Sequence, residues 1–383
     1  MRSPECMAPA RPPAVRMPAD PAITAVRARA YTIPTDAPEA DGSFRWTSTT
    51  LVLVEVDAGG ATGLGYTYAD ASAAALVRDA LADALLRQDP WPGGELWLRM
   101  QQRVRNLGRE GLAASAISAV DCALWDLKAR LLGVPLVRLL GAVRGRVPIY
   151  GSGGFTSYDE ERLREQLAGW VHRDGCRWVK MKVGTAPTED PRRVRRARDA
   201  IGAHAGLFVD ANGALVARQA LRCAEAFARE DVRWFEEPVS SDDLAGLRLL
   251  RARGPAGMEI AAGEYVYTLD DARRLLEAGA VDVLQADVSR CGGITGFLRI
   301  AALAQAFHVP LSGHCAPALH LHAALAAPGL RHLEWFHDHV RIEAMLFDGA
   351  PRPEAGAIAA DLASPGCGLV FRRRDAERYA VAA

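Results

Sequence analysis

Residues 178–184 read WVKMKVG, residues 206–213 read GLFVDANG, and residues 233–238 read RWFEEP. Each is a short apolar run that ends in charged or polar side chains, and an Arg- and Ala-rich stretch with a helical pattern separates it from the next. Buried parallel strands are almost continuously apolar, and consecutive parallel strands need a crossover connection, usually a helix. The repetition therefore predicts successive βα units.

Five further runs extend this pattern to eight strands: VPIYGSGG (147–154), EIAAGE (259–264), VDVLQAD (281–287), VPLSGH (309–314) and HLEW (332–335). The polar residues that close the second to eighth runs lie 20–28 residues apart: Lys182, Asp210, Glu236, Glu264, Asp287, His314 and Glu334. Eight such units predict a (β/α)8-type barrel with these side chains on its functional face. A doubly wound sheet would not bring seven strand ends around one point, and no G-x-G-x-x-G motif follows an early strand.

The sequence pattern of the rest of the 383-residue chain predicts a second domain. Residues 23–145 begin with strand-like runs and continue with helices, which is typical of an α+β domain. A polar loop, Thr35–Trp46, is long enough to act as a lid. We place the barrel at 146–347 and expect residues 348–383 to fold back on the first domain. The Pro-, Ala- and Arg-rich residues 1–22 are predicted to be disordered.

Charge and cysteine content exclude several function classes. The 46 basic and 46 acidic residues cancel, so the composition gives no electrostatic case for binding nucleic acid or an anionic membrane. No apolar run approaches the length of a bilayer span. The seven cysteines show no C-x-x-C spacing, which favours reduced thiols and a cytoplasmic protein.

Asp210, Glu236 and Glu264 close three consecutive strands. Three carboxylates on one rim repel unless a cation bridges them, and an all-oxygen set favours a hard divalent ion, Mg²⁺ first and Mn²⁺ second. For any single acid a salt bridge to one of the many arginines is the simpler interpretation, but it is a poor account of all three. Asn212 lies on the same strand face as Asp210 and is a candidate orienting partner.

Lysine is rare in this chain, since it occurs only at Lys128, Lys180 and Lys182. Two lysines at i and i+2 share one strand face, beside the predicted metal site. Arg cannot lose its proton at neutral pH, whereas a lysine near another ammonium group and a dication can. The pair therefore predicts a neutral amine that acts as a base. The alternative is an ordinary pair of surface lysines.

His314 and Asp287 close neighbouring strands, so a carboxylate is expected on one imidazole nitrogen, leaving the other for proton transfer. A lone histidine near an apolar strand is more often structural, and we assign a structural role to His320, His322, His332, His337 and His339. Glu334 closes the eighth strand. Next to a metal-bound anion we expect it to stay protonated and to donate a hydrogen bond to developing oxyanion charge.

Together these motifs resemble the enolase superfamily, and within it the mandelate racemase subgroup. The features that carry the resemblance are K-x-K in VKMKVG, D-x-N in VDANG, EEP in WFEEP, GE in AAGEY, the Asp before RCGGITG, the His of SGHC and the late HLEW. The helical segment AISAVDCALWDLKARLLGVPLVRLLGA resembles the last helix of that family's capping domain and its link to the barrel.

The resemblance implies a (β/α)7β barrel with an α+β capping domain made from both chain ends. It implies one Mg²⁺ per subunit on Asp210, Glu236 and Glu264. It also implies Lys182 as the base on one substrate face and His314, oriented by Asp287, on the other. Lys180 and Glu334 would stabilise the enediolate. A homo-oligomer, often an octamer, is expected.

Two outcomes follow α-proton abstraction, and the motifs leave both open. A returned proton gives racemisation or epimerisation, whereas loss of a β-hydroxyl gives dehydration to a 2-keto acid. The HCAPALHLHAA segment is more similar to acid-sugar dehydratases, so dehydration is favoured. No Lys follows Lys182, unlike muconate-lactonising and dipeptide-epimerising relatives, and Glu264 replaces the Asn of glucarate dehydratase relatives.

Substrate specificity is expected in the lid and in the following GYTYAD turn, with Arg45, Trp46, Tyr66 and Tyr68 as candidates. An Arg can clamp a distal carboxylate and a Tyr can bond hydroxyls, although solvated or packing roles are the simpler interpretation of each. Two other classes remain as alternatives. A Schiff-base aldolase would use Lys182 as nucleophile without a metal, and a non-catalytic sugar-acid binding protein would not need Lys182 or His314.

Overall fold

The computed structural model describes residues 21–382, and its centre is a closed barrel of parallel strands. The strands are β4 (Val147–Gly153), β5 (Trp178–Lys182), β6 (Gly206–Asp210), β7 (Val232–Glu236), β8 (Glu259–Ala262), β9 (Val283–Ala286), β10 (Leu311–Gly313) and β11 (Leu330–Phe336). They pair in chain order, and β11 pairs with β4 to close the ring. All eight predicted strands are present, and the predicted barrel is confirmed.

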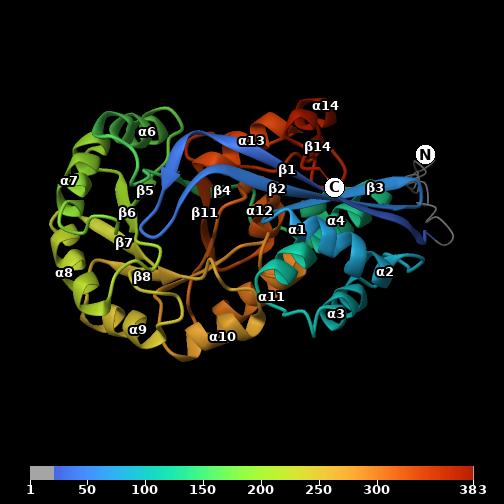
Figure 1. Ribbon diagram of the computed structural model, residues 1–383, viewed down its shortest axis with the longest axis horizontal. Helices are drawn as coiled ribbons and strands as arrows, with labels where there is room; N and C mark the ends of the chain where they lie inside the picture. The colour runs from blue at the N-terminus through green and yellow to red at the C-terminus, as the bar shows by residue number, and fades with distance from the viewer. Residues whose placement is uncertain (1–20, 383) are drawn as a thin grey trace, which may run out of the picture.

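One helix connects each pair of successive barrel strands, which gives the (β/α)7β arrangement seen in Figure 1. These helices are α6 (Glu160–His172), α7 (Asp190–Ile201), α8 (Ala217–Ala228), α9 (Leu244–Arg253), α10 (Leu269–Glu277), α11 (Gly293–Ala306) and α12 (Pro317–Ala326). Helix α13 (His337–Leu346) follows β11. Local sequence determines where α10 begins, because the Thr268 hydroxyl and the Asp271 carboxylate form a capping box at its N-terminus.

An antiparallel sheet and a group of helices form the capping domain beside the barrel (Figure 1). Its strands are β1 (Ile23–Ala40), β2 (Arg45–Ala58) and β3 (Ala61–Tyr68). Its helices are α1 (Ser72–Leu76), the π-helix η1 (Val77–Leu81), α2 (Ala82–Leu85), α3 (Gly93–Arg103), α4 (Leu112–Leu131) and α5 (Leu136–Leu140). Helix α4 packs directly on β3 because Gly63 and Gly65 leave room: a Cβ at Gly65 would lie 2.1 Å from the Ala119 carbonyl oxygen.

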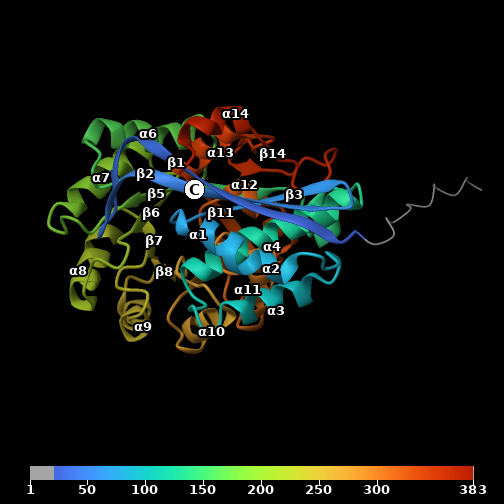
Figure 2. The ribbon, with the colours of Figure 1, turned by 45° about the vertical axis from the view of Figure 1, so that its right-hand side comes forward.

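The segment Thr35–Trp46 is not the loop that the sequence predicted. Residues through Ala40 belong to β1 and Arg45 begins β2, with Glu39 opposite Trp46 in register after a bulge. The resulting long hairpin extends from the capping sheet to the barrel in both ribbon views (Figures 1 and 2). The segment is strand rather than loop because backbone pairing with β2 resumes beyond the bulge.

The tip of this hairpin docks on the barrel rim. The Asp41 carbonyl oxygen accepts hydrogen bonds from the hydroxyls of Thr156 and Thr185 at 2.9 and 2.7 Å. Gly42 lies so close to the loops after β5 and β6 that an added Cβ would be 2.3 Å from the Ala211 carbonyl oxygen. The capping domain is thereby fixed against the barrel end that carries the polar strand termini.

The chain after α13 returns to the capping domain. It contains β12 (Phe347–Asp348), β13 (Ala357–Ile358), β14 (Val370–Phe371), α14 (Arg373–Ala376) and the 3-10 helix η2 (Glu377–Tyr379). The Val381 amide donates to the Ala30 carbonyl, and Arg29 pairs with Glu377 at 2.7 Å. Strand β13 instead pairs with β4 of the barrel. Of the segment 1–22 predicted to be disordered, residues 1–20 lie outside the described residues.

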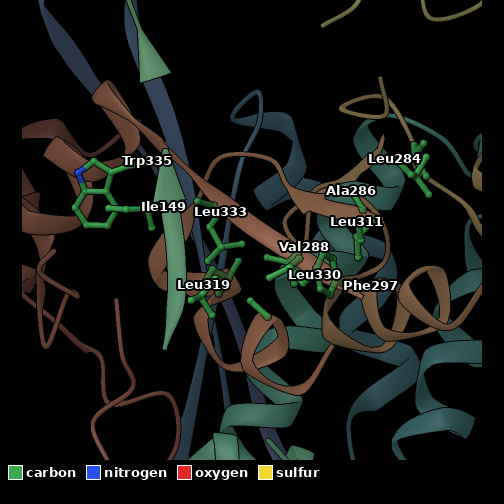
Figure 3. Close-up of a cluster of buried hydrophobic side chains, with 14 of the residues drawn as sticks. Ile149, Leu284, Ala286, Val288, Phe297, Leu311, Leu319, Leu330, Leu333 and Trp335 are labelled. Atoms are coloured by element: carbon green, nitrogen blue, oxygen red, sulfur yellow. The ribbon is translucent and has the colours of Figure 1, made fainter. Parts of the chain in front are cut away.

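The main hydrophobic core fills the layer between the barrel and its helices. Figure 3 shows part of it, with Leu284, Leu311 and Leu330 of three neighbouring strands and Phe297 of α11, and with Leu333 near Leu319 of α12. Across residues 21–382, no helix has both the length and the apolar character that a membrane crossing requires. The six described cysteines are free thiols.

A buried polar contact joins the capping domain to the barrel. The Tyr66 hydroxyl of β3 donates to the Glu343 carboxylate of α13 at 2.6 Å, and the Ala318 amide donates to the second carboxylate oxygen at 3.2 Å. Burial raises the pKa of Glu343 to about 8 from an ordinary 4.5. The folded chain therefore keeps a proton that the unfolded chain releases. The protonated Glu343 side chain therefore contributes fully to the stability of the fold below pH 4.5, and this contribution is lost as the pH rises to 8.

Replacing Glu343 with Gln should flatten part of the pH dependence of stability. Between about pH 5 and 8 the free energy of unfolding of the wild-type chain should fall more steeply than that of Glu343→Gln, because the amide does not ionise. Urea unfolding at a series of pH values measures this difference. The exposed Glu225→Gln on α8 is the control and should follow the wild type. Parallel pH profiles for wild type and Glu343→Gln would contradict the assignment.

Candidate active site

The barrel places the predicted site residues in one register row. Lys182 of β5 pairs with Asp210 of β6, which pairs with Glu236 of β7. All three are buried, as are Lys180, Glu264, Asp287, His314 and Glu334. Side chains at i and i+2 of a strand point the same way, so Lys180 lies one layer deeper on the same face as Lys182. The structure thus brings both lysines and the strand-end acids together.

The two lysines are held by carboxylates. The Lys180 ammonium group lies 2.5 Å from Glu236, 2.8 Å from Glu334 and 3.5 Å from Asp210, and that of Lys182 lies 2.6 Å from Asp210. Burial favours the neutral amine, but these carboxylates outweigh it and hold the pKa of both lysines above the ordinary value. The fall in pKa expected from sequence requires a dication beside the two lysines, and it stays a prediction.

The His314 ring lies between acids on both sides. Its Nδ1 is 2.8 Å from Asp287, and its Nε2 is 2.8 Å from Glu264 and 3.6 Å from Glu334. Burial lowers the pKa of an imidazole, yet interactions with Cys315, Glu334 and Asp287 raise the pKa of His314 well above its ordinary value. Asp287 also accepts from the amide and hydroxyl of Ser289, so its carboxylate is fixed in place.

Glu334 is the most heavily bonded acid of the site. It accepts hydrogen bonds from the Ser152 hydroxyl at 2.5 Å and from the Cys315 amide at 3.0 Å, and it contacts Lys180. Burial raises its pKa, but Lys180 and His314 lower it more, and the net pKa lies below the ordinary value. The protonated Glu334 expected from sequence belongs to a site that holds a metal-bound anion, and it stays a prediction.

The carboxylates suit a divalent cation. Asp210, Glu236, Glu237 and Glu264 are all buried, and mutual repulsion with burial raises the pKa of Glu237 well above its ordinary value. Buried oxygen atoms of Glu237 (Oε1) and Asn212 (Oδ1) have no hydrogen-bond partner. The Asn212 side-chain amide donates to Glu264 at 3.3 Å and its backbone amide to Asp210 at 2.9 Å. Clustered buried carboxyl groups with unsatisfied oxygen atoms are what a hard ion such as Mg²⁺ requires.

The predicted specificity residues lie in different surroundings. Arg45 is exposed near the hairpin tip. Trp46 donates to Glu39 at 2.8 Å and packs edge-on against Phe155, in a cluster that also contains Cys315. Tyr66 bonds Glu343, as described above. Tyr68 is buried in a stack on His339, with its hydroxyl 3.4 Å from the His339 carbonyl oxygen.

The five histidines that were assigned a structural role bond to other parts of the fold. The Val288 amide donates to His320 Nε2 at 2.9 Å, and His332 Nδ1 lies 3.0 Å from the Ser312 hydroxyl. The Ala316 amide donates to His339 Nδ1 at 3.2 Å. His322 contacts the Cys367 carbonyl and His337 contacts Asp36.

Several residues at the site were not identified from sequence. Glu237 adds a fourth acid and directly follows Glu236. Arg290 donates to the Glu264 carbonyl at 3.1 Å, and its Nε lies 3.6 Å from Asp287. Cys315 Sγ lies 3.3 Å from His314 Nε2. Glu237 and Cys315 directly follow predicted residues in the sequence, and Arg290 lies three residues after one. Closeness in the sequence of a loop, however, does not determine where a side chain points.

Family models match both parts of the chain. The mandelate racemase/muconate lactonizing enzyme N-terminal domain model covers residues 25–141, and the enolase C-terminal domain-like model covers residues 162–376.

Three known proteins illustrate the similarity. A 3,6-anhydro-α-L-galactonate cycloisomerase of Streptomyces coelicolor is 38% identical over 74% of this chain and 80% of its own. The L-talarate/galactarate dehydratase of Salmonella typhimurium is 33% identical over 79% of this chain and 78% of its own. Its structure with Mg and L-lyxarohydroxamate has a TM-score of 0.87 at 28% identity, with 100% and 98% coverage of this chain and that one. A mandelate racemase/muconate lactonizing enzyme-like protein of Rubrobacter xylanophilus is 53% identical, with a TM-score of 0.92 and 94% and 100% coverage.

Asp287→Asn should lower the pKa of His314, because the charged partner of Nδ1 is removed while Glu264 and Glu334 remain. Nuclear magnetic resonance of ring-labelled histidine, recorded against pH without added metal, measures the shift. Asp190→Asn replaces a buried aspartate that accepts from the Gly184 amide, away from His314, and should leave the His314 pKa unchanged. An unchanged pKa in Asp287→Asn would show that Asp287 does not set the protonation of this ring.

Proposed function

The chain belongs to the mandelate racemase and muconate lactonizing enzyme family of the enolase superfamily, and from that premise we propose that it dehydrates an acid sugar to a 2-keto-3-deoxy acid. The proposed first step is removal of the proton α to the substrate carboxylate, which leaves an enediolate. An enzyme of the lyase or isomerase type is what the comparisons support. The observation that carries the proposal is the placement of Lys182 and the Asp287–His314 pair around one group of buried acids.

Asp210, Glu236 and Glu264 would hold Mg²⁺, and Asn212 would orient Asp210 and Glu264 through its two amide donors. When bound, Mg²⁺ polarises a substrate carboxylate and so acidifies its α-proton. The same acids determine the protonation state of the lysines. Lys182 keeps its proton because it contacts Asp210 at 2.6 Å, and once a cation neutralises Asp210 the burial of Lys182 favours the neutral amine. Lys182 is then the base for the α-proton.

His314 is proposed to act on the opposite face of the substrate. Asp287 occupies Nδ1 and leaves Nε2 as the nitrogen that exchanges a proton with the substrate. Because Asp287 and Glu334 favour its protonated form, His314 is suited to protonate a departing β-hydroxyl. Lys180 remains charged between Glu236 and Glu334 and stabilises negative charge on the enediolate oxygens. Glu334 positions Lys180.

Water loss is the outcome that the similarity to the Salmonella typhimurium dehydratase favours. The second candidate is an isomerase reaction, which the similarity to the Streptomyces coelicolor cycloisomerase favours. Both use the same abstraction step and differ in the fate of the enediolate. Arg45 and Trp46 at the hairpin tip are proposed to contribute to substrate choice. Replacement of Mg²⁺ by Mn²⁺, a cytoplasmic location and a homo-oligomer of up to eight subunits stay predictions from sequence.

Incubation with a panel of mono- and di-acid sugars and Mg²⁺ tests the reaction. We expect 2-keto acid from one stereochemical group of substrates, and we expect EDTA to abolish it. The same panel in D₂O, read by mass spectrometry, detects deuterium at the α-carbon. Deuterium uptake without keto acid would establish the isomerase candidate instead. Metal binding without either signal on any α-hydroxy acid would contradict an enzyme and support a binding protein.

Lys182→Ala should reduce turnover about 10²–10⁴-fold, the usual contribution of a positioned acid or base. It should also abolish the deuterium exchange that Lys182 catalyses. Steady-state kinetics and isotope exchange measure the two effects. Lys128→Ala is the matched control, since the Lys128 amine lies over the Trp125 ring in α4 and its loss should leave both measurements unchanged. Retained turnover in Lys182→Ala would remove this lysine from the mechanism.

A further inference from the structure

Three different ligand types meet on one side of the candidate site. His314 Nε2, Cys315 Sγ and a Glu334 carboxylate oxygen lie within 4.8 Å of one another. The sulfur is 3.3 Å from Nε2 and 3.4 Å from Glu334 Oε2, and Nε2 is 3.6 Å from the same oxygen. All three residues are buried. This triangle differs from the Asp210, Glu236 and Glu264 group, which offers oxygen atoms alone.

The backbone is shaped to turn Cys315 toward this triangle. Cys315 and Ala316 both adopt left-handed conformations, with φ of 51° and 39°. Consecutive non-glycine residues in this region carry a conformational cost that the surrounding structure must offset. The Cys315 amide donates to Glu334 Oε2 at 3.0 Å and the Ala316 amide donates to His339 Nδ1 at 3.2 Å, and these two bonds fix the turn.

We propose that His314, Cys315 and Glu334 form a second metal site, selective for a thiophilic divalent ion of the zinc class. Zinc sites combine Cys, His and carboxylate ligands at about 2.3 Å for sulfur and about 2.0–2.2 Å for nitrogen and oxygen. Tetrahedral placement at those lengths separates the ligand atoms by roughly 3.4–3.6 Å, close to the separations in the structure. A fourth position stays open for water or substrate. Mg²⁺ prefers oxygen and does not compete for this site.

Occupation of this site and proton transfer by His314 exclude each other. Asp287 already occupies Nδ1, so a metal on Nε2 takes the only nitrogen that can exchange a proton with substrate. Binding breaks the Cys315 S–H bond and the His314 Nε2–H bond, forms the S–metal and N–metal bonds, and releases both protons to solvent. Burial and Glu334 raise the pKa of the Cys315 thiol to about 12, so the ion must displace a proton that the free chain holds. The inhibitory consequence rests on the proposed function, whereas metal binding does not.

The simpler interpretation is that Cys315 only packs. It belongs to a small cluster with Phe155, Tyr158 and Phe336, where a thiol behaves as a small apolar group. That interpretation explains the burial of Cys315 but predicts no sulfur–metal bond. The two interpretations therefore differ in a direct spectroscopic observable that needs no activity.

Titration of the full-length protein with Co²⁺ in excess Mg²⁺ tests the proposal. We expect a near-ultraviolet thiolate-to-cobalt charge-transfer band that saturates at one Co²⁺ per chain and is removed by Zn²⁺. Cys315→Ser and Cys315→Ala should both lose the band. Their Zn²⁺ affinity should fall by more than the roughly 10–100-fold that loss of an outer-shell partner costs. Cys223→Ser, which alters a buried thiol of α8 on the barrel exterior, should keep the band.

Absence of the band in the wild type, or its persistence in folded Cys315→Ser and Cys315→Ala, would overturn the metal site. Zn²⁺ should also inhibit acid-sugar turnover of the wild type and of Cys223→Ser at fixed Mg²⁺. If the band is present but no substrate is turned over, the proposed function fails while the metal site stands. If turnover is normal and no band appears, the metal site fails alone.

Discussion

The structure depends on balancing a dense set of buried charges at one end of the barrel. Ionised groups that are removed from water without partners cost several kcal/mol each, so the acids at the strand ends need cations within contact distance. The chain supplies Lys180, Lys182 and His314 for this purpose, each in direct contact with at least one carboxylate. Glu237 remains without such a partner, and one of its oxygens is unsatisfied. The unsatisfied oxygen within this dense group of acids supports the proposed binding of a divalent cation.

The remaining architecture keeps those charges in place and limits their contact with water. Parallel pairing puts the ends of β5, β6 and β7 in one row, which no local feature of a single strand could do. The capping domain then sends the β1–β2 hairpin across to the rim, where Gly42 packs against the loops that carry the acids. The Tyr66–Glu343 bond connects the base of the cap to α13. Contacts at the hairpin tip, at this seam, between α4 and α11 and along the C-terminal segment hold the two units in a single arrangement.

The barrel and most of the site were predictable because they depend on periodic features. Strand ends recur 20–28 residues apart, and the scarcity of lysine singles out the pair at 180 and 182. The hairpin was misjudged because its polar composition is typical of a loop, while its conformation depends on pairing with β2. The roles of Tyr66 and Tyr68 depend on α13, whose contacting residues lie 277 and 271 positions further along the chain. Lys180 lies 2.8 Å from Glu334 and lowers its pKa, a contact that no spacing in the sequence reveals.

The preference for arginine elsewhere in the chain gives a reason for the two lysines. An arginine at 182 would pair with Asp210 equally well but would stay charged after a cation neutralised that carboxylate. A lysine in the same place changes state when its partner is neutralised, because burial then decides its protonation. In the proposed mechanism the Asp210–Lys182 contact would therefore link cation binding to the creation of a base. Under the proposed function the acids would serve two purposes, since they hold both lysines protonated in the free chain and would form the site whose occupation releases the proton of Lys182, while Lys180 stays charged.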